Sequence, residues 1–173
     1  MKYITCFFAL MTGFALTPAL ADKDPDNSSQ ASERIVAGYA ETITLLDSGI
    51  EVNALMDSGA NTSSMHALDI ESFKRGDEDE EWVRFVFESG DQSITIEQPV
   101  TRYTRIIQHS GERDRRPVIE LDFCLAGKIH RTEFNLTDRS ELTYPLLLGR
   151  RFLADAVLID SAASKTLSPD CPG

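Results

Sequence analysis

The sequence contains few of the residues that build metal and nucleotide sites. Its three histidines, His66, His109 and His130, are scattered along 173 residues. It has no His-Glu-x-x-His sequence and no Gly-x-x-x-x-Gly-Lys-Ser/Thr loop, which are the patterns of a zinc-protease helix and of a phosphate-binding loop. We therefore predict neither a metal nor a nucleotide cofactor.

Basic residues are also scarce relative to acidic ones. Lysine and arginine number 17 against 28 aspartates and glutamates, which gives a formal net charge of −11. Because an acidic surface repels the phosphate backbone, we predict no nucleic-acid partner.

Long hydrophobic runs are confined to the N-terminus. A charged start is followed by an apolar stretch over residues 4–20 and by a small-x-small site that ends at Ala21, which is the order of a secretory signal peptide. The stretch is shorter than the roughly 20 residues of a spanning helix, and Pro18 interrupts it. We expect a signal peptide over residues 1–21, cleaved before Asp22, and a periplasmic or secreted product without stable membrane insertion.

Cysteines are few, because cleavage at that point leaves only Cys124 and Cys171. In an oxidising compartment these two could form one disulfide that ties the C-terminal tail to the body of the protein. The alternative is a buried Cys124 and a free thiol in the tail, and the sequence leaves both open.

The residues after the signal peptide number 173 − 21 = 152, which is an ordinary size for one domain. Residues 22–34 are polar and have no apolar period, so we interpret them as a disordered leader. A domain over residues 35–168 and a short tail over residues 169–173 follow.

Short β-prone runs separated by turn residues fill the domain. Glycine-containing turns at residues 47–49, 88–91 and 109–112 join three pairs of such runs, which predicts three hairpins. Helical signals are confined to residues 64–73 and 151–155. We therefore predict a mainly β fold, a closed or nearly closed barrel or sandwich with one or two short helices. The expected strands lie at residues 42–46, 50–56, 82–87, 93–96, 102–107, 118–125, 129–136, 146–148 and 156–159.

The first segment with chemical character is Asp57-Ser58-Gly59-Ala60, which directly follows a β-prone run. A carboxylate at this position lies on a tight turn at the mouth of the core, where Gly59 permits close approach and Ser58 can fix the loop by local hydrogen bonds. Asp-Ser-Gly is also an ordinary turn sequence. This segment alone therefore does not separate catalysis from a structural turn.

The second segment is Leu146-Leu147-Leu148-Gly149-Arg150. Three consecutive leucines are typical of a strand that is buried on both faces. A glycine at the end of such a strand lets another chain segment pass close by. The segment thus predicts a strand that is buried on both faces and that another chain segment approaches closely at Gly149.

This pair of motifs resembles that of the retropepsins. The wider sequence, including residues 116–118 and 135–140, resembles a bacterial retropepsin-like family that contains RimB-type proteins and carries the label of ATP-dependent zinc protease. The resemblance covers roughly residues 35–167. It implies a retropepsin-like (acid protease) closed β-barrel in which Asp57 is the catalytic carboxylate. It also implies that the Asp57 loop is supported by Leu147, Leu148, Gly149 and Arg150.

Two positions depart from the pattern of that family. Ser58 stands where threonine is common, which keeps the hydroxyl, and Asn61 stands where a basic residue is more usual, which bears on substrate contacts. The label of an ATP-dependent zinc protease finds no support in the motifs of this chain. We interpret His66 as a structural residue near the Asp57 loop rather than as a metal ligand.

A single aspartate cannot act as acid and base at once. Aspartic proteases use one ionised carboxylate to activate water and one protonated carboxylate to donate to the carbonyl, and two such groups about 3 Å apart share one proton. Asp-Ser-Gly-Ala occurs once in the chain. We therefore predict an exported aspartic endopeptidase that acts on a peptide or protein substrate as a homodimer, with Asp57 of both chains at the two-fold axis. The alternatives are a non-catalytic retropepsin-like binding or scaffold module of the cell envelope, and a monomer whose Asp57 only holds its loop.

The segment between the two motifs contains a predicted flap. The hairpin over residues 102–118 has a polar tip around Ser110 and Gly111, and loops of this kind often close over substrates. The alternative is a plain exposed hairpin.

Arginines concentrate in this hairpin and in the segments that follow it. They are Arg102, Arg105, Arg113, Arg115, Arg116, Arg139, Arg150 and Arg151. On an acidic chain such a cluster predicts a negatively charged substrate held by bidentate contacts. The alternative is that these arginines pair with Glu112, Asp114 and the acidic run at residues 77–81.

Overall fold

The computed structural model describes residues 34–77, 79–107 and 113–171. The predicted signal peptide, nearly all of the predicted leader and the flap tip with Ser110 and Gly111 lie outside these ranges. Within them the elements are β1 (Ile35–Gly38), β2 (Ala40–Leu45), β3 (Ile50–Asp57), β4 (Ser63–His66), β5 (Leu68–Arg75), β6 (Glu80–Ser89), β7 (Gln92–Pro99), β8 (Arg102–Ile107), β9 (Arg113–Leu125), β10 (Lys128–Thr137), β11 (Leu146–Gly149), α1 (Arg150–Ala156) and β12 (Val157–Asp160).

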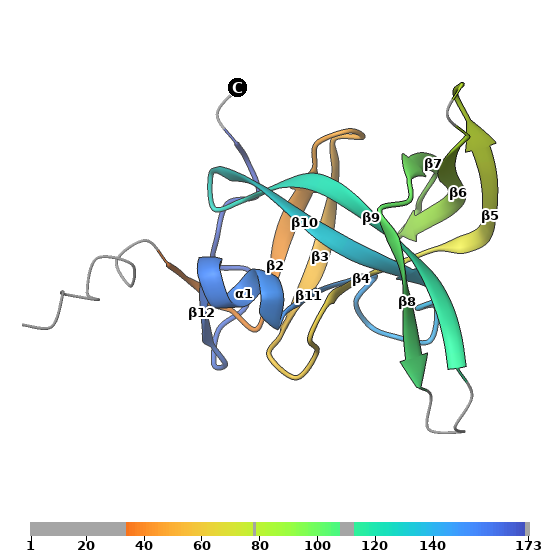
Figure 1. Cartoon of the computed structure of the whole chain (residues 1–173). Coiled ribbons are helices and arrows are strands. Elements are labelled where there is room, and N and C mark those ends of the chain that lie inside the picture. The colour runs from red at the N-terminus through yellow and green to blue at the C-terminus, as the bar shows by residue number, and fades with distance from the viewer. Residues whose placement is uncertain (1–33, 78, 108–112, 172–173) are drawn as a thin grey trace, which may run out of the picture.

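Six strands close into a barrel of mixed parallel and antiparallel pairs. Their order is β10-β4-β11-β3-β2-β9, and β9 pairs with β10 to complete the circle. Figure 1 shows β9 and β10 as long strands that cross in front of β2 and β3. A barrel leaves few free strand edges, and only β8 extends the sheet beyond β9. The predicted closed, mainly β barrel is confirmed.

Two smaller sheets lie outside the barrel. The antiparallel sheet β5-β6-β7 projects from one side of it, and the parallel pair β1–β12 lies beside α1 (Figure 1). The hairpins β2–β3 and β6–β7 form as predicted. Strands β8 and β9 also pair antiparallel over the predicted third hairpin.

The alternation of β3 positions the first motif. Ile50, Val52, Ala54 and Met56 are buried in the core, and successive side chains of a strand point to opposite faces. Asp57, the next residue, is therefore turned out of the core, and its side chain is partly exposed.

The predicted helix over residues 64–73 is wrong. The segment forms β4 and β5 instead, because β4 is inserted between β10 and β11 and bonds to both. All four residues of β4 are buried, so tertiary pairing overrides the local helical preference. The helix predicted at residues 151–155 is confirmed as α1. In the part of the chain that the structure covers, no helix has the length and hydropathy to cross a membrane.

A disulfide and the hydrogen bonds of a buried carboxylate hold the C-terminal segment against the barrel. Cys124 and Cys171 form a disulfide, so the first of the two alternatives for these cysteines holds. The fully buried carboxylate of Glu41 accepts hydrogen bonds from the backbone of Thr166 and Leu167 at 2.8 and 3.1 Å. A buried carboxylate is tolerated only with such partners, so Glu41 fixes the path of the tail.

Candidate active site

The Asp57 carboxylate is held by its own turn. Its Oδ1 accepts hydrogen bonds from the backbone N–H of Gly59 at 2.8 Å and of Ala60 at 3.2 Å. Such bonds fix the orientation of the carboxylate. Its second oxygen, Oδ2, receives no hydrogen bond from residues of the described ranges. One oxygen is thus committed to the turn, and the other is available to a second group.

The second motif lies directly beside this turn. Strand β11 runs parallel to β3, and Gly149 lies in register with Asp57. A Cβ atom on Gly149 would come within 2.6 Å of the carbonyl carbon and oxygen of Thr62. The Gly149 N–H donates to Ser63 Oγ at 3.1 Å. Only glycine fits here, because the chain that leaves the Asp57 loop crosses directly over it.

Helix α1 binds the same loop through its first turn. The N–H groups of Arg150 and Arg151 donate to the carbonyls of Ala60 at 2.8 Å and Asn61 at 3.2 Å. The helix has no side-chain cap at Gly149, so these carbonyls satisfy donors that would otherwise lack partners. The loop and the helix therefore move as one unit.

Arg150 adds a side-chain clamp to that unit. Its Nη1 donates to the carbonyl of Ser58 at 3.1 Å and to that of Gly59 at 3.4 Å. The guanidinium thus spans the turn that carries Asp57. The sequence assigned Arg150 to support of this loop, and the structure places its guanidinium against the turn.

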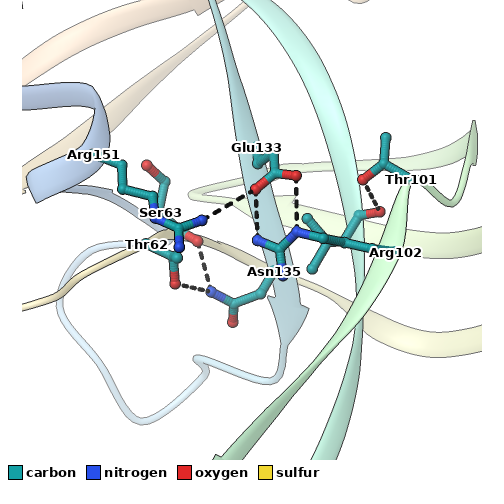
Figure 2. A network of polar contacts seen from close by, with 8 residues as sticks. Thr62, Ser63, Thr101, Arg102, Glu133, Asn135 and Arg151 are labelled. Carbon is teal, nitrogen blue, oxygen red and sulfur yellow. Dashed lines mark hydrogen bonds and ion pairs between the residues drawn. The ribbon is translucent and has the colours of Figure 1, made fainter. Parts of the chain in front are cut away.

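Asn135 of β10 organises the residues after the loop (Figure 2). Its Nδ2 donates to Ser63 O at 2.6 Å and to Thr62 Oγ1 at 3.4 Å. Its Oδ1 accepts from Ser64 Oγ at 3.3 Å. Sequence reasoning gave Asn135 no role. The one available signal was a polar residue between two apolar ones, Phe134 and Leu136.

Glu133, two residues earlier on β10, joins three elements. Its carboxylate accepts two hydrogen bonds from Arg102 of β8, at 2.9 and 2.5 Å, and lies 3.8 Å from Arg151 of α1 (Figure 2). The bidentate contact with Arg102 holds the pKa of the Glu133 carboxyl below its ordinary value. Glu133 was not predicted. It couples the helix behind the Asp57 loop to the first strand of the predicted flap hairpin.

The remaining arginines of that hairpin have separate surroundings. Arg116 pairs with Asp114 at 2.6 Å, as the alternative interpretation expected. Arg115 stacks over the Tyr103 ring, 3.4 Å from its centroid. Arg105 lies opposite Arg115 in the backbone pairing of β8 with β9, and its side chain is exposed. The Arg113 side chain lies outside the described part of the structure. Pairing with local acids thus accounts for only part of the cluster.

Arg139 is the most enclosed of the predicted arginines, with 8% of its surface exposed. Its Nε donates to the Tyr144 carbonyl at 3.1 Å, and its backbone N–H donates to His66 Nδ1 at 2.9 Å. Burial lowers the pKa of the Arg139 guanidinium, an effect that the nearby Asp57 carboxylate opposes and the Arg116 charge reinforces. Arg139 and Arg116 thus place positive charge on the Asp57 side of the barrel.

The side chains of the described residues do not form a zinc site. Across the residues that the structure covers, no group of three or more His, Cys, Asp or Glu side chains lies close enough to hold a metal ion. His66 Nδ1 is engaged by the Arg139 backbone, and the His130 ring packs between Phe123 and Phe152. The zinc implied by the family label therefore does not fit, and no chemical step is assigned to it.

Comparisons with known proteins agree with this geometry. The model of the RimB-like family, described as retropepsin-like aspartic endopeptidase RimB, matches residues 36–169. A solved structure from Legionella pneumophila, of a protein of unknown function, aligns with a TM-score of 0.67 and 30% identity and covers 76% of this chain and 96% of that one.

Two curated relatives carry the name "Probable alpha-L-glutamate ligase". The protein from Shewanella pealeana is 37% identical over 117 residues, which are 65% of this chain and 25% of the relative. The protein from Parasynechococcus marenigrum is 33% identical over 141 residues, which are 79% of this chain and 30% of the relative. The chain thus spans less than a third of the length of these relatives.

Proposed function

The chain belongs to the RimB-like family of retropepsin-like aspartic endopeptidases, and from that premise we propose that it hydrolyses peptide bonds through paired Asp57 carboxylates in a homodimer. The proposal rests on the hydrogen bonds of the Asp57 carboxylate. Its Oδ1 accepts from two backbone N–H groups, while its Oδ2 accepts no hydrogen bond from the residues described. An Asp57 that served only its own turn would not need the support of β11, α1 and Arg150.

The chemistry follows from two such groups at a two-fold axis. Two adjacent carboxylates cannot both ionise, so the pair holds one proton between the two Oδ2 atoms. The ionised Asp57 accepts a proton from water as it attacks the peptide carbonyl, and the protonated Asp57 donates to the carbonyl oxygen. The N–H groups of Gly59 and Ala60 keep each carboxylate in position during this exchange. Activity is expected to be highest at mildly acidic pH, where the pair carries a single proton.

A negatively charged substrate is supported by the positive charge around the site. A cavity of about 470 Å³ is lined by Arg115 and Arg116, and the acidic Asp114 and Asp138 offset part of their charge. Arg139 places positive charge near Asp57. The relatives named glutamate ligases, of which this domain covers a part, are named for an acidic amino acid. We propose acidic peptides as the substrate class, with the β8–β9 hairpin as the flap above them.

Export is supported by the disulfide. The bond between Cys124 and Cys171 is typical of an oxidising compartment, as is the secretory pattern of residues 1–21. We propose a periplasmic or secreted location for the mature protein.

A non-catalytic module is the second candidate. The relatives are three to four times longer than the matched segment, so in them the barrel accompanies other domains and could serve to bind rather than to cleave. This candidate predicts peptide binding without turnover.

Replacement of Asp57 by asparagine tests the proposal. The amide oxygen can still accept from Gly59 and Ala60, so Asp57→Asn should fold normally but cannot share the proton. Asp160 offers a matched control, because it also ends a strand and accepts from the N–H two residues later, of Ala162, at 2.9 Å. We expect Asp57→Asn to abolish cleavage of acidic peptides at mildly acidic pH and Asp160→Asn to retain it.

The outcomes separate the candidates. Full activity in Asp57→Asn would falsify the catalytic role. Absence of cleavage in the unmodified protein, together with saturable peptide binding, would favour the non-catalytic module. Sedimentation analysis of the same samples tests the homodimer, because a protein that cleaves as a monomer would exclude the shared dyad.

A further inference from the structure

A second cavity lies against α1. It has a volume of about 420 Å³ and is bounded by α1, by the beginning of β10 and by β1. Figure 1 shows α1 beside β12, the strand that pairs with β1. The wall contains Ile35, Lys128, His130, Arg131, Thr132, Arg151, Phe152, Asp155 and Ala156. Asp57 is not among these residues, so the cavity is separate from the proposed active site.

Opposite charges line this cavity. Lys128, Arg131 and Arg151 contribute positive charge, and Asp155 contributes negative charge. Arg131 is occupied by Asp122, which accepts two hydrogen bonds from it at 2.6 Å. Lys128 and Arg151 have weaker contacts with acidic groups.

The freedom of Lys128 and Arg151 is visible in their contacts. Lys128 is exposed and takes part in no ion pair within the described ranges. The Arg151 side chain is 60% exposed and only 3.8 Å from Glu133, a separation that leaves its other N–H groups available. Two positive groups and one negative group therefore face the same space without satisfying one another.

The floor of the cavity is apolar and includes an unusual histidine. Ile35, Phe152 and Ala156 supply the apolar surface. The His130 ring lies 5.3 Å from the Phe152 ring, centroid to centroid. Its buried Nε2 has no hydrogen-bond partner among the residues described, which is uncommon for a buried polar atom. A polar ligand atom that displaced the edge of Phe152 would supply that partner.

We propose that this cavity binds a free acidic α-amino acid. Lys128 and Arg151 would receive the carboxylates, and Asp155 would pair with the ammonium group. A simple anion would be repelled by Asp155, and a simple cation by Lys128 and Arg151. A zwitterion with an additional carboxylate matches all three, and its aliphatic chain covers the apolar floor.

Binding of an amino acid to this cavity does not require peptidase activity and can be measured directly. Titration of the full mature protein with L-glutamate, followed by amide NMR, should shift the signals of Lys128 and of residues 151–156. Glutarate lacks the ammonium group and should bind about fivefold more weakly, the size expected for the loss of one exposed charge contact. Inorganic phosphate should bind more weakly still. Asp57→Asn should bind L-glutamate as the unmodified protein does.

Paired variants complete the test. Lys128→Gln and Asp155→Asn should each weaken L-glutamate binding by about fivefold, while Lys74→Gln on β5 and Asp91→Asn in the β6–β7 turn should leave it unchanged. The proposal is overturned if millimolar L-glutamate shifts none of these signals. It is also overturned if glutarate or phosphate binds as tightly, or if the two cavity variants bind like the controls.

Discussion

The substitution Gly149→Ala isolates the contact between the two motifs. Gly149 has φ −92° and ψ 173°, a backbone conformation that alanine adopts without strain. The added methyl carbon would lie 2.6 Å from the Thr62 carbonyl carbon and oxygen and 3.0 Å from the Ser63 nitrogen. All three are backbone atoms, so no flexible side chain can yield. The substitution therefore tests steric closeness alone.

The expected change in the free energy of unfolding is the sum of two opposing contributions. Overpacking of a close contact costs about 1–3 kcal/mol, occasionally more. Replacement of glycine by alanine stabilises by about 0.4–1 kcal/mol through the unfolded chain. The contact is at the severe end of overpacking, so we expect a net loss of about 1–3 kcal/mol in the free energy of unfolding.

Urea unfolding followed by the fluorescence of the single tryptophan, Trp82, measures this loss. Gly90→Ala serves as the control, because Gly90 has φ +60° and no atom within 4 Å of the added carbon. It should cost about 1–2 kcal/mol from backbone strain and leave the Asp57 loop undisturbed. Gly149→Ala should in addition shift the amide NMR signals of Ala60 and Arg150, because Thr62 must move. Unchanged stability together with unchanged loop signals would refute the reasoning.

Three further predictions concern stability and specificity. Glu41→Gln should lower the free energy of unfolding by about 1–3 kcal/mol, because the amide nitrogen replaces one of the two oxygens and cannot accept from the backbone N–H groups that donate to it, either that of Gly38 or those of Thr166 and Leu167. Glu51→Gln, at an exposed position of β3, should change little in the same urea assay. Arg102 holds the pKa of Glu133 below its ordinary value, so the stabilisation by Glu133 is present above the ordinary pKa and is lost as the pH falls through the lowered pKa. Glu133→Gln should therefore be less stable than the unmodified protein at neutral pH, and the difference should shrink as the pH falls through the acid range; an undiminished difference in acid would contradict the network. Changing Arg113, Arg115 and Arg116 together to Glu should reduce cleavage of acidic peptides far more than of neutral ones, and added salt should weaken the preference of the unmodified protein; equal loss on both peptides would mean damage to the hairpin instead.

Local pattern predicted most of the barrel. The predicted strand at residues 42–46 overlaps β2, and those at 50–56 and 129–136 lie within β3 and β10, because the alternation of apolar and polar residues matches the strand period wherever one face is buried. The short helix after Gly149 and the closeness of the two motifs were also predicted. The Cys124–Cys171 bond was one of two alternatives that the sequence left open.

The failures have a common cause. The sequence of β4 is short and polar, and it is a strand because β10 and β11 flank it. Glu133 and Asn135 are ordinary polar residues of β10 until the barrel closes and brings Arg102, Arg151 and the residues after the Asp57 loop against them. Partners that lie far apart along the chain leave no periodic signal in a single sequence.

The sequence by itself therefore determined the mainly β class, the family resemblance and the position of Asp57, because each depends on neighbouring residues: alternation along a strand, the residue types of a turn, a run of leucines before glycine. Only the tertiary structure decided how Asp57 is held. The loop is fixed by the N–H groups of α1, by the Arg150 guanidinium and by the crossing over Gly149. These contacts exist because a closed barrel brings distant segments within hydrogen-bonding distance.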